Sequence, residues 1–95
     1  MPELPDVENV VRGLKKNILN KKIYDVEVLT ESIINGDQNF TQKVKGQIIE
    51  DIQRRGKYII IKLNQGNLLI HLRMTGKLLY NGDMDKHTHL ILYLA

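Results

Sequence analysis

The sequence predicts an α+β domain that is mainly β: an antiparallel β-sandwich or barrel-like sheet with an N-terminal amphipathic helix and a second, short helix. A long run of apolar residues at helical spacing occurs only near the start of the chain. After it, short apolar runs alternate with turn signals about every eight to twelve residues, which is typical of antiparallel sandwiches and barrels. We expect one small domain, residues 1–95, with a core of modest size.

The amphipathic helix is expected from about Pro5 to Asn17. Proline suits the first turn, where its missing N–H has no helical partner. Asp6 and Glu8 lie near the positive end of the helix dipole, and Lys15 lies near its negative end. The apolar stripe consists of Leu4, Val7, Val10, Val11, Leu14 and Ile18. Packing of this stripe would hold residues 2 and 3 against the body of the domain.

The rest of the chain predicts strands at 22–30, 47–55, 57–63, 68–72, 77–80 and 88–94, with a short helix at 40–45. In the first strand, Tyr24, Val26 and Val28 alternate with acidic residues and are expected to share the buried side. The turn signal at 64–67 predicts an antiparallel hairpin between the flanking runs.

The composition narrows the possible classes of protein. The chain has no cysteine, which excludes a disulfide and a thiolate zinc site within these 95 residues. Fourteen Lys and Arg against eleven Asp and Glu give a net charge of +3, a weak preference for polyanionic partners. The apolar runs are too short to cross a bilayer, and no signal peptide opens the chain. We expect a cytoplasmic protein without a membrane partner.

The first residues suggest an active site. Removal of Met1 would leave Pro2 with a free secondary amine. Generic pKa values of about 8 for a terminal amine and about 10.4 for lysine give it roughly a hundredfold more free base at neutral pH. Such an amine can form an iminium with a sugar aldehyde carbon. Glu3 could move the proton, although helix capping is an equal alternative for this residue.

Arg54, Arg55 and Lys57 surround Gly56 between two apolar runs. The simpler interpretation is a solvated bend. The functional one is a phosphate-binding corner, in which glycine lets the backbone come close and Lys57 reaches inward. Because Lys57 adjoins an apolar run that starts at Tyr58, we expect it to be partly buried.

A second candidate segment runs from His71 through Arg73 and Met74 to Gly76. A single histidine on an apolar strand is more often a core residue with a hydrogen-bond partner than a ligand. Met74 next to a cation and a turn suggests the apolar wedges that some proteins insert between DNA bases, although a core role is the simpler alternative.

His87 and His89 place two imidazoles on one face of the last predicted strand. A metal pair is conceivable, but no third ligand has suitable spacing. We therefore expect a structural or hydrogen-bonding role and no metal site.

Three segments together resemble the formamidopyrimidine-DNA glycosylase family of the MutM type: PELPDVE at residues 2–8, RRGKYIII at 54–61 and HLRMTGKL at 71–78. The resemblance covers the whole chain. Endonuclease VIII relatives usually show Pro-Glu-Gly-Pro at the start, so Leu4 favours the formamidopyrimidine branch. Asp6 and Arg73 depart from the family, which often has glutamate and glycine there.

The resemblance implies a glycosylase and abasic-site lyase that acts on oxidised purines in double-stranded DNA. It implies that the Pro2 amine attacks the sugar and that Glu3 protonates the ring oxygen. Lys57 and His71 would contact phosphates, with Arg54, Arg55 and Arg73 as further cations on the DNA side. Met74 would fill the gap left by the flipped base.

The family also has a helical domain and a four-cysteine zinc finger, which this chain lacks. We therefore expect the front part of a longer monomeric protein, without a cofactor in this chain and with zinc in the missing C-terminal domain. The isolated 95 residues are expected to be weak or inactive. The alternatives are a non-catalytic nucleic-acid-binding β module, an endonuclease VIII-type enzyme for oxidised pyrimidines, and a plain structural domain.

Overall fold

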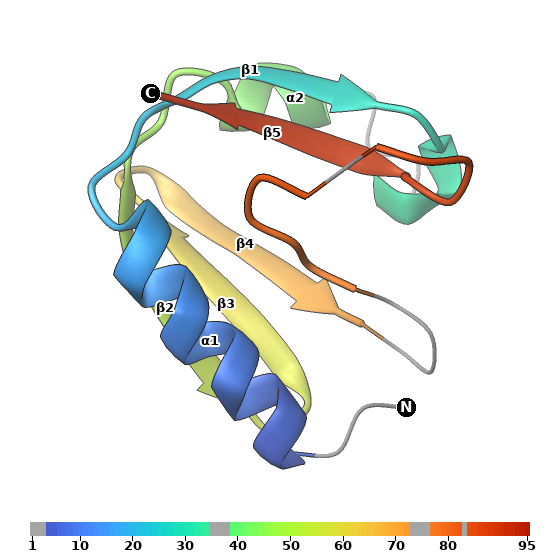
Figure 1. Cartoon of the computed structure of the whole chain (residues 1–95). Coiled ribbons are helices and arrows are strands. Elements are labelled where there is room, and N and C mark those ends of the chain that lie inside the picture. Colours follow the sequence, from blue (N-terminus) through green and yellow to red (C-terminus); the bar gives the residue numbers. More distant parts are fainter. Residues whose placement is uncertain (1–3, 35–38, 73–76, 83) are drawn as a thin grey trace.

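The computed structural model describes residues 4–34, 39–72, 77–82 and 84–95 (Figure 1). Its elements are the helix α1 (Leu4–Ile18), the strand β1 (Ile23–Val28), a 3-10 turn η1 (Glu31–Ile34), the helix α2 (Phe40–Val44) and the strands β2 (Ile49–Arg55), β3 (Tyr58–Leu63), β4 (Gly66–His71) and β5 (Leu90–Leu94). The described strands form two antiparallel sheets, and the predicted class, mainly β with two helices, is confirmed.

The larger sheet is a meander in the order β2–β3–β4, and the smaller sheet pairs β1 with β5. The predicted hairpin is confirmed: β3 and β4 pair in register from Leu63 opposite Gly66 to Tyr58 opposite His71. In Figure 1, α1 lies alongside β2 and β3, and the β1–β5 pair crosses the top of the molecule.

The core is a single cluster of aliphatic side chains between these elements. The expected stripe of α1 supplies its buried residues at helical spacing, and the strands add isoleucines that are fully enclosed. The buried set is Val7, Val11, Leu14, Ile18, Ile23, Val26, Val44, Ile49, Ile52, Ile59, Ile61 and Leu63. Burial of each large aliphatic side chain contributes about 1.5–3 kcal/mol, so this cluster fixes α1 on the sheet.

The strand β1 departs from the predicted alternation. Tyr24 is 52% exposed, whereas Ile23 and Val26 are buried. The register of β1 against β5 shifts between Ile23 and Asp25, and such a bulge moves the following side chains to the other face. The exposed Tyr24 ring lies 6.1 Å from that of Tyr93.

The strand predicted at 77–80 is wrong, because the described residues 77–82 form no strand. Leu78 packs partly against the core, but Leu79 is 64% exposed and Tyr80 is 41% exposed, so this segment gains little from apolar burial. The last strand also begins later than predicted, at Leu90. A turn precedes it, in which the Asp85 amide donates to Thr88 Oγ1 at 2.9 Å.

None of the helices in the described ranges is long and apolar enough to span a membrane.

Candidate functional site

The turn between β2 and β3 carries two solvent-facing cations, and we call Arg55 and Lys57 the cationic corner. Arg55 ends β2, and Gly56 turns the chain with a φ of +59°, in the left-handed region that glycine enters at little cost. Both Arg55 and Lys57 are exposed. The expectation that Lys57 would be partly buried is therefore wrong, because the residue belongs to the turn and precedes the first strand position of β3.

The paired strands extend this corner across the sheet. Arg55 lies opposite Tyr58, and Tyr58 lies opposite His71. Directly opposed residues in a sheet point to the same face. The three side chains therefore form one row at one end of β2, β3 and β4, and the structure brings together two residues predicted from separate motifs.

Tyr58 begins the apolar run that follows Lys57, yet the residue is 43% exposed. Its ring packs on the imidazole of half-buried His71, with the ring centroids 4.8 Å apart and the planes inclined by 36°. The neighbours Ile59 and Ile61 are buried, so strand alternation places Tyr58 on the outer face. That alternation was the sequence signal that could have identified the pair.

Arg54 lies on the opposite face and makes two contacts within the protein. Its Nε donates to Oε2 of Glu8 on α1 at 2.6 Å, and its Nη1 donates to the carbonyl oxygen of Gly56 at 3.0 Å. One guanidinium therefore joins the helix to the β2–β3 turn. The predicted role of Arg54 in DNA binding remains a prediction, and Glu8 was not considered as a site residue.

The hydrogen bond from Arg54 lowers the pKa of the Glu8 carboxyl below its ordinary value, helped by the nearby charges of Arg12 and Lys15. A lowered pKa in the folded state means that the contact stabilises the fold above the unfolded pKa. The contribution is lost only when the pH falls through the lowered pKa. The ion pair is therefore intact throughout the neutral range.

The start of α1 and the β2–β3 turn lie at the same end of the molecule (Figure 1). The row described above places the end of β4 there as well. Pro2 and Glu3, which precede α1, and Arg73 and Met74, which follow β4, lie outside the described residues, so their predicted roles stay predictions.

The histidines near β5 make local hydrogen bonds. His89 Nδ1 lies 2.7 Å from Thr30 Oγ1, which agrees with the hydrogen-bonding role expected for it. The backbone amide of His87 donates to Asp85 Oδ1 at 2.7 Å. Within the described ranges, no group of three His, Asp or Glu side chains is arranged to hold a metal ion.

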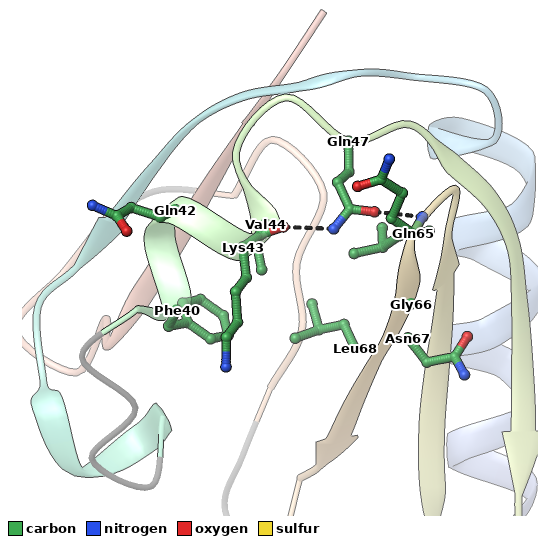
Figure 2. Close-up of a pocket in the computed structure, with 10 residues that line it drawn as sticks. Phe40, Gln42, Lys43, Val44, Gln47, Gln65, Gly66, Asn67 and Leu68 are labelled. Carbon is green, nitrogen blue, oxygen red and sulfur yellow. Dashed lines mark hydrogen bonds between the residues drawn. The ribbon is translucent and has the colours of Figure 1, made fainter.

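A depression of about 480 Å³ lies at the other end of the larger sheet, between α2 and the β3–β4 turn (Figure 2). Figure 2 shows the side chain of Gln47 bridging the two sides. Its Nε2 donates to the Lys43 carbonyl at 2.5 Å, and its Oε1 accepts from the Gln65 amide at 2.8 Å. Of the ten described residues that line the depression, only Lys43 is ionisable. We therefore assign the depression a structural role.

Gly56→Ala is expected to lower the free energy of unfolding by about 1–2 kcal/mol, because alanine disfavours the left-handed region. An added Cβ would meet no atom within 4 Å, so the cost comes from the backbone alone. Gly13→Ala is the matched control: this exposed helical position also has room for a Cβ, and the substitution should stabilise by about 0.5–1 kcal/mol. Thermal unfolding of both variants measures the difference, and equal shifts would contradict the assigned turn.

Comparison with known proteins agrees with the sequence motifs and the fold. The family model described as the N-terminal domain of formamidopyrimidine-DNA glycosylase matches residues 1–95. The formamidopyrimidine-DNA glycosylases of Ligilactobacillus salivarius and Carboxydothermus hydrogenoformans are 44% and 47% identical to the chain over 96 and 101 residues. The matches cover 96% and 100% of this chain but only 35% and 38% of those proteins.

Solved structures show the same relationship. A complex between Lactococcus lactis FPG (MutM) and DNA containing FAPY-dG matches with a TM-score of 0.87 and 36% identity. The match covers 98% of this chain and 37% of that one. A complex of MutM with DNA containing carbocyclic 8-oxo-G has a TM-score of 0.86 at 36% identity, over 99% of this chain and 38% of that one. The chain therefore belongs to the formamidopyrimidine-DNA glycosylase family, and it corresponds to the N-terminal domain of that family.

Proposed function

We propose that this chain is the catalytic N-terminal domain of a base-excision repair enzyme that removes oxidised purines from double-stranded DNA and cleaves the resulting abasic site. The observation that carries the proposal is the match of the family model to all 95 residues, including the amino-terminal Pro2-Glu3. Related structures hold DNA containing FAPY-dG or carbocyclic 8-oxo-G, which supports damaged DNA as the partner.

In the proposed reaction, the nitrogen of mature Pro2 attacks C1′ of the damaged nucleotide. The glycosidic bond breaks, and the base leaves with its electron pair and gains the proton that the attacking nitrogen gives up. Glu3 protonates the ring oxygen, the sugar opens, and the nitrogen lone pair forms an iminium with C1′. Loss of a proton from C2′ then expels the 3′ phosphate, and a second elimination expels the 5′ phosphate.

The proposed DNA-facing surface is the cationic corner together with His71. The exposed cations of the corner can contact phosphate oxygens, which position DNA without reading its sequence. Arg73 and Met74 come one residue after the end of β4, and we assign Met74 the role of filling the space left by the flipped nucleotide. An inserted apolar side chain offsets part of the cost of unstacking, which is a few kcal/mol.

The zinc expected for the family does not fit this chain. The sequence has no cysteine, and the described ranges contain no group of metal-binding side chains. We propose that the zinc finger belongs to the portion of the relatives' length that this chain does not span. We also propose that the whole protein is a cytoplasmic monomer of the formamidopyrimidine branch, and that the 95 residues alone have little activity.

Borohydride trapping tests the proposal. The full-length protein, mixed with duplex DNA containing an oxidised guanine, should give a covalent adduct when the iminium is reduced. No adduct with damaged DNA, together with retained DNA affinity, would identify a non-catalytic binding module instead. Faster trapping on oxidised pyrimidines would favour the endonuclease VIII type. Turnover by the 95-residue chain at the full-length rate would contradict its predicted weakness.

The cationic corner should set part of the salt dependence of DNA binding. Lys57→Gln and Arg55→Gln in the full-length protein should each reduce the slope of log K against log salt by about 1. Lys62→Gln serves as a control, because this exposed lysine lies four strand positions from Tyr58 and outside the corner. An unchanged slope in both corner variants, measured by fluorescence anisotropy, would show that DNA does not contact this turn.

A further inference from the structure

We propose that the Glu8–Arg54 ion pair is a positioning device: it sets where the start of α1 lies relative to the cationic corner, and thereby where the Pro2 amine meets the bound strand. This inference rests on the proposed function. It assigns Arg54 to the placement of the nucleophile, in contrast to a direct contact with DNA.

The contacts of Arg54 are directional. Its Nε is 2.6 Å from Glu8 Oε2, and its Nη1 is 3.0 Å from the carbonyl oxygen of Gly56. A guanidinium is planar and holds its donors in fixed relative positions. Movement of α1 relative to the turn would therefore break one of the two bonds. The Arg54 side chain is only 33% exposed, and the flanking Arg55 is exposed on the other face of the strand.

A second ion pair lies further along the same helix and strand. Lys15 Nζ is 4.0 Å from Asp51 Oδ1. Seven helical residues separate Glu8 from Lys15, a rise of about 10.5 Å. Three strand residues separate Asp51 from Arg54, about 10 Å. The two spacings match, so α1 runs antiparallel along β2, with the Glu8–Arg54 pair near the start of the helix and the more loosely held Lys15–Asp51 pair further along it.

The position of α1 matters because Pro2 is only two residues from Leu4, where the helix begins. Two residues span at most about 7 Å even when fully extended, so the position of the first turn limits where the amine can lie. A misplacement of about 1 Å in reacting groups can reduce a rate about a hundredfold. Of the two ion pairs, Glu8–Arg54 lies nearer to the start of α1. Lys15–Asp51 lies about two helical turns further along the helix.

The experiment uses the full-length protein and single-turnover borohydride trapping at saturating DNA, with DNA affinity measured across a salt series. Glu8→Gln and Arg54→Gln should each slow trapping about tenfold without changing the salt slope. The double variant should be no slower than either single variant, because the two side chains act as one unit. Arg54→Lys keeps the positive charge but lacks the planar guanidinium that donates two hydrogen bonds in fixed directions. Trapping by this variant should therefore be as slow as by Arg54→Gln.

Lys15→Gln is the matched control, since it removes the ion pair that lies away from the start of α1, and it should trap at the parental rate. Thermal unfolding of every variant separates slow chemistry from loss of folded protein. If all variants trap at the parental rate per folded molecule, the pair is only structural and the inference fails.

A direct phosphate contact predicts another pattern. Arg54→Gln would then reduce the salt slope by about 1, Arg54→Lys would restore it, and Glu8→Gln would leave trapping unchanged or strengthen DNA binding. That pattern would overturn the inference. A parent protein that forms no adduct would instead overturn the proposed function, so the two failures are distinguishable.

Discussion

A full-length protein whose Pro2 nitrogen is held in a peptide bond is expected to form the covalent adduct at least about a thousandfold more slowly than the mature protein. An amide nitrogen has no available lone pair, whereas a free terminal amine with a pKa of about 8 is partly unprotonated at neutral pH. One residue added before Pro2, or retention of Met1, creates this amide. Borohydride trapping on DNA with an oxidised guanine measures the rate.

The control restores the amine in the same molecules. A protease site placed directly before Pro2 allows the extension to be removed, and trapping should recover after cleavage. The variant Pro2→Gly keeps a terminal amine but makes it primary and removes the proline ring, so its adduct should form more slowly than that of the mature protein. An extended protein that traps as fast as the mature one would show that the Pro2 nitrogen is not the nucleophile.

Ile59→Ala is expected to have the largest effect on stability. Ile59 has no exposed surface, and it lies in the central strand of the larger sheet, so truncation leaves a cavity beneath α1 and the strands. Large-to-alanine substitutions in such positions cost about 2–5 kcal/mol of unfolding free energy. For a domain of this size the unfolding temperature should fall by at least about 10 °C, measured by circular dichroism during heating.

Ile33→Ala is the matched control. Ile33 is 50% exposed in the 3-10 turn η1, so the same truncation removes little buried contact. A change within about 0.5 kcal/mol is expected for a surface position. Similar losses for both variants would contradict the position of the core.

Short-range sequence patterns correctly predicted α1 and the β3–β4 hairpin, which form between residues close in the chain. The spacing of apolar residues predicted α1 to within about one residue, and the turn residues after Leu63 predicted the β3–β4 hairpin with its partners. The bulge in β1 was not predictable, because it depends on how that strand meets β5 far along the chain. The segment 77–80 failed for a related reason: only Leu78 packs against the core, whereas Leu79 and Tyr80 are exposed.

The candidate site divides in the same way. The motifs predicted Arg55, Lys57 and His71 as site residues, and strand pairing places Arg55 and His71 in one row. The motifs did not predict the ion pair between Glu8 and Arg54, which are 46 positions apart. That contact depends on how α1 packs on β2. The roles of Pro2, Glu3, Arg73 and Met74, which lie outside the described residues, rest on the sequence motifs and the family.

The β3–β4 hairpin also sets the spacing between the sequence motifs at 54–61 and 71–78. Tyr58 and His71 face each other because β3 and β4 have equal lengths on either side of their turn. Since side chains alternate between faces, insertion of one residue into either strand would move one ring to the opposite face. Insertion of two residues into each strand would keep both rings on the outer face and opposite each other. We therefore expect changes in length here to add the same even number of residues to both strands.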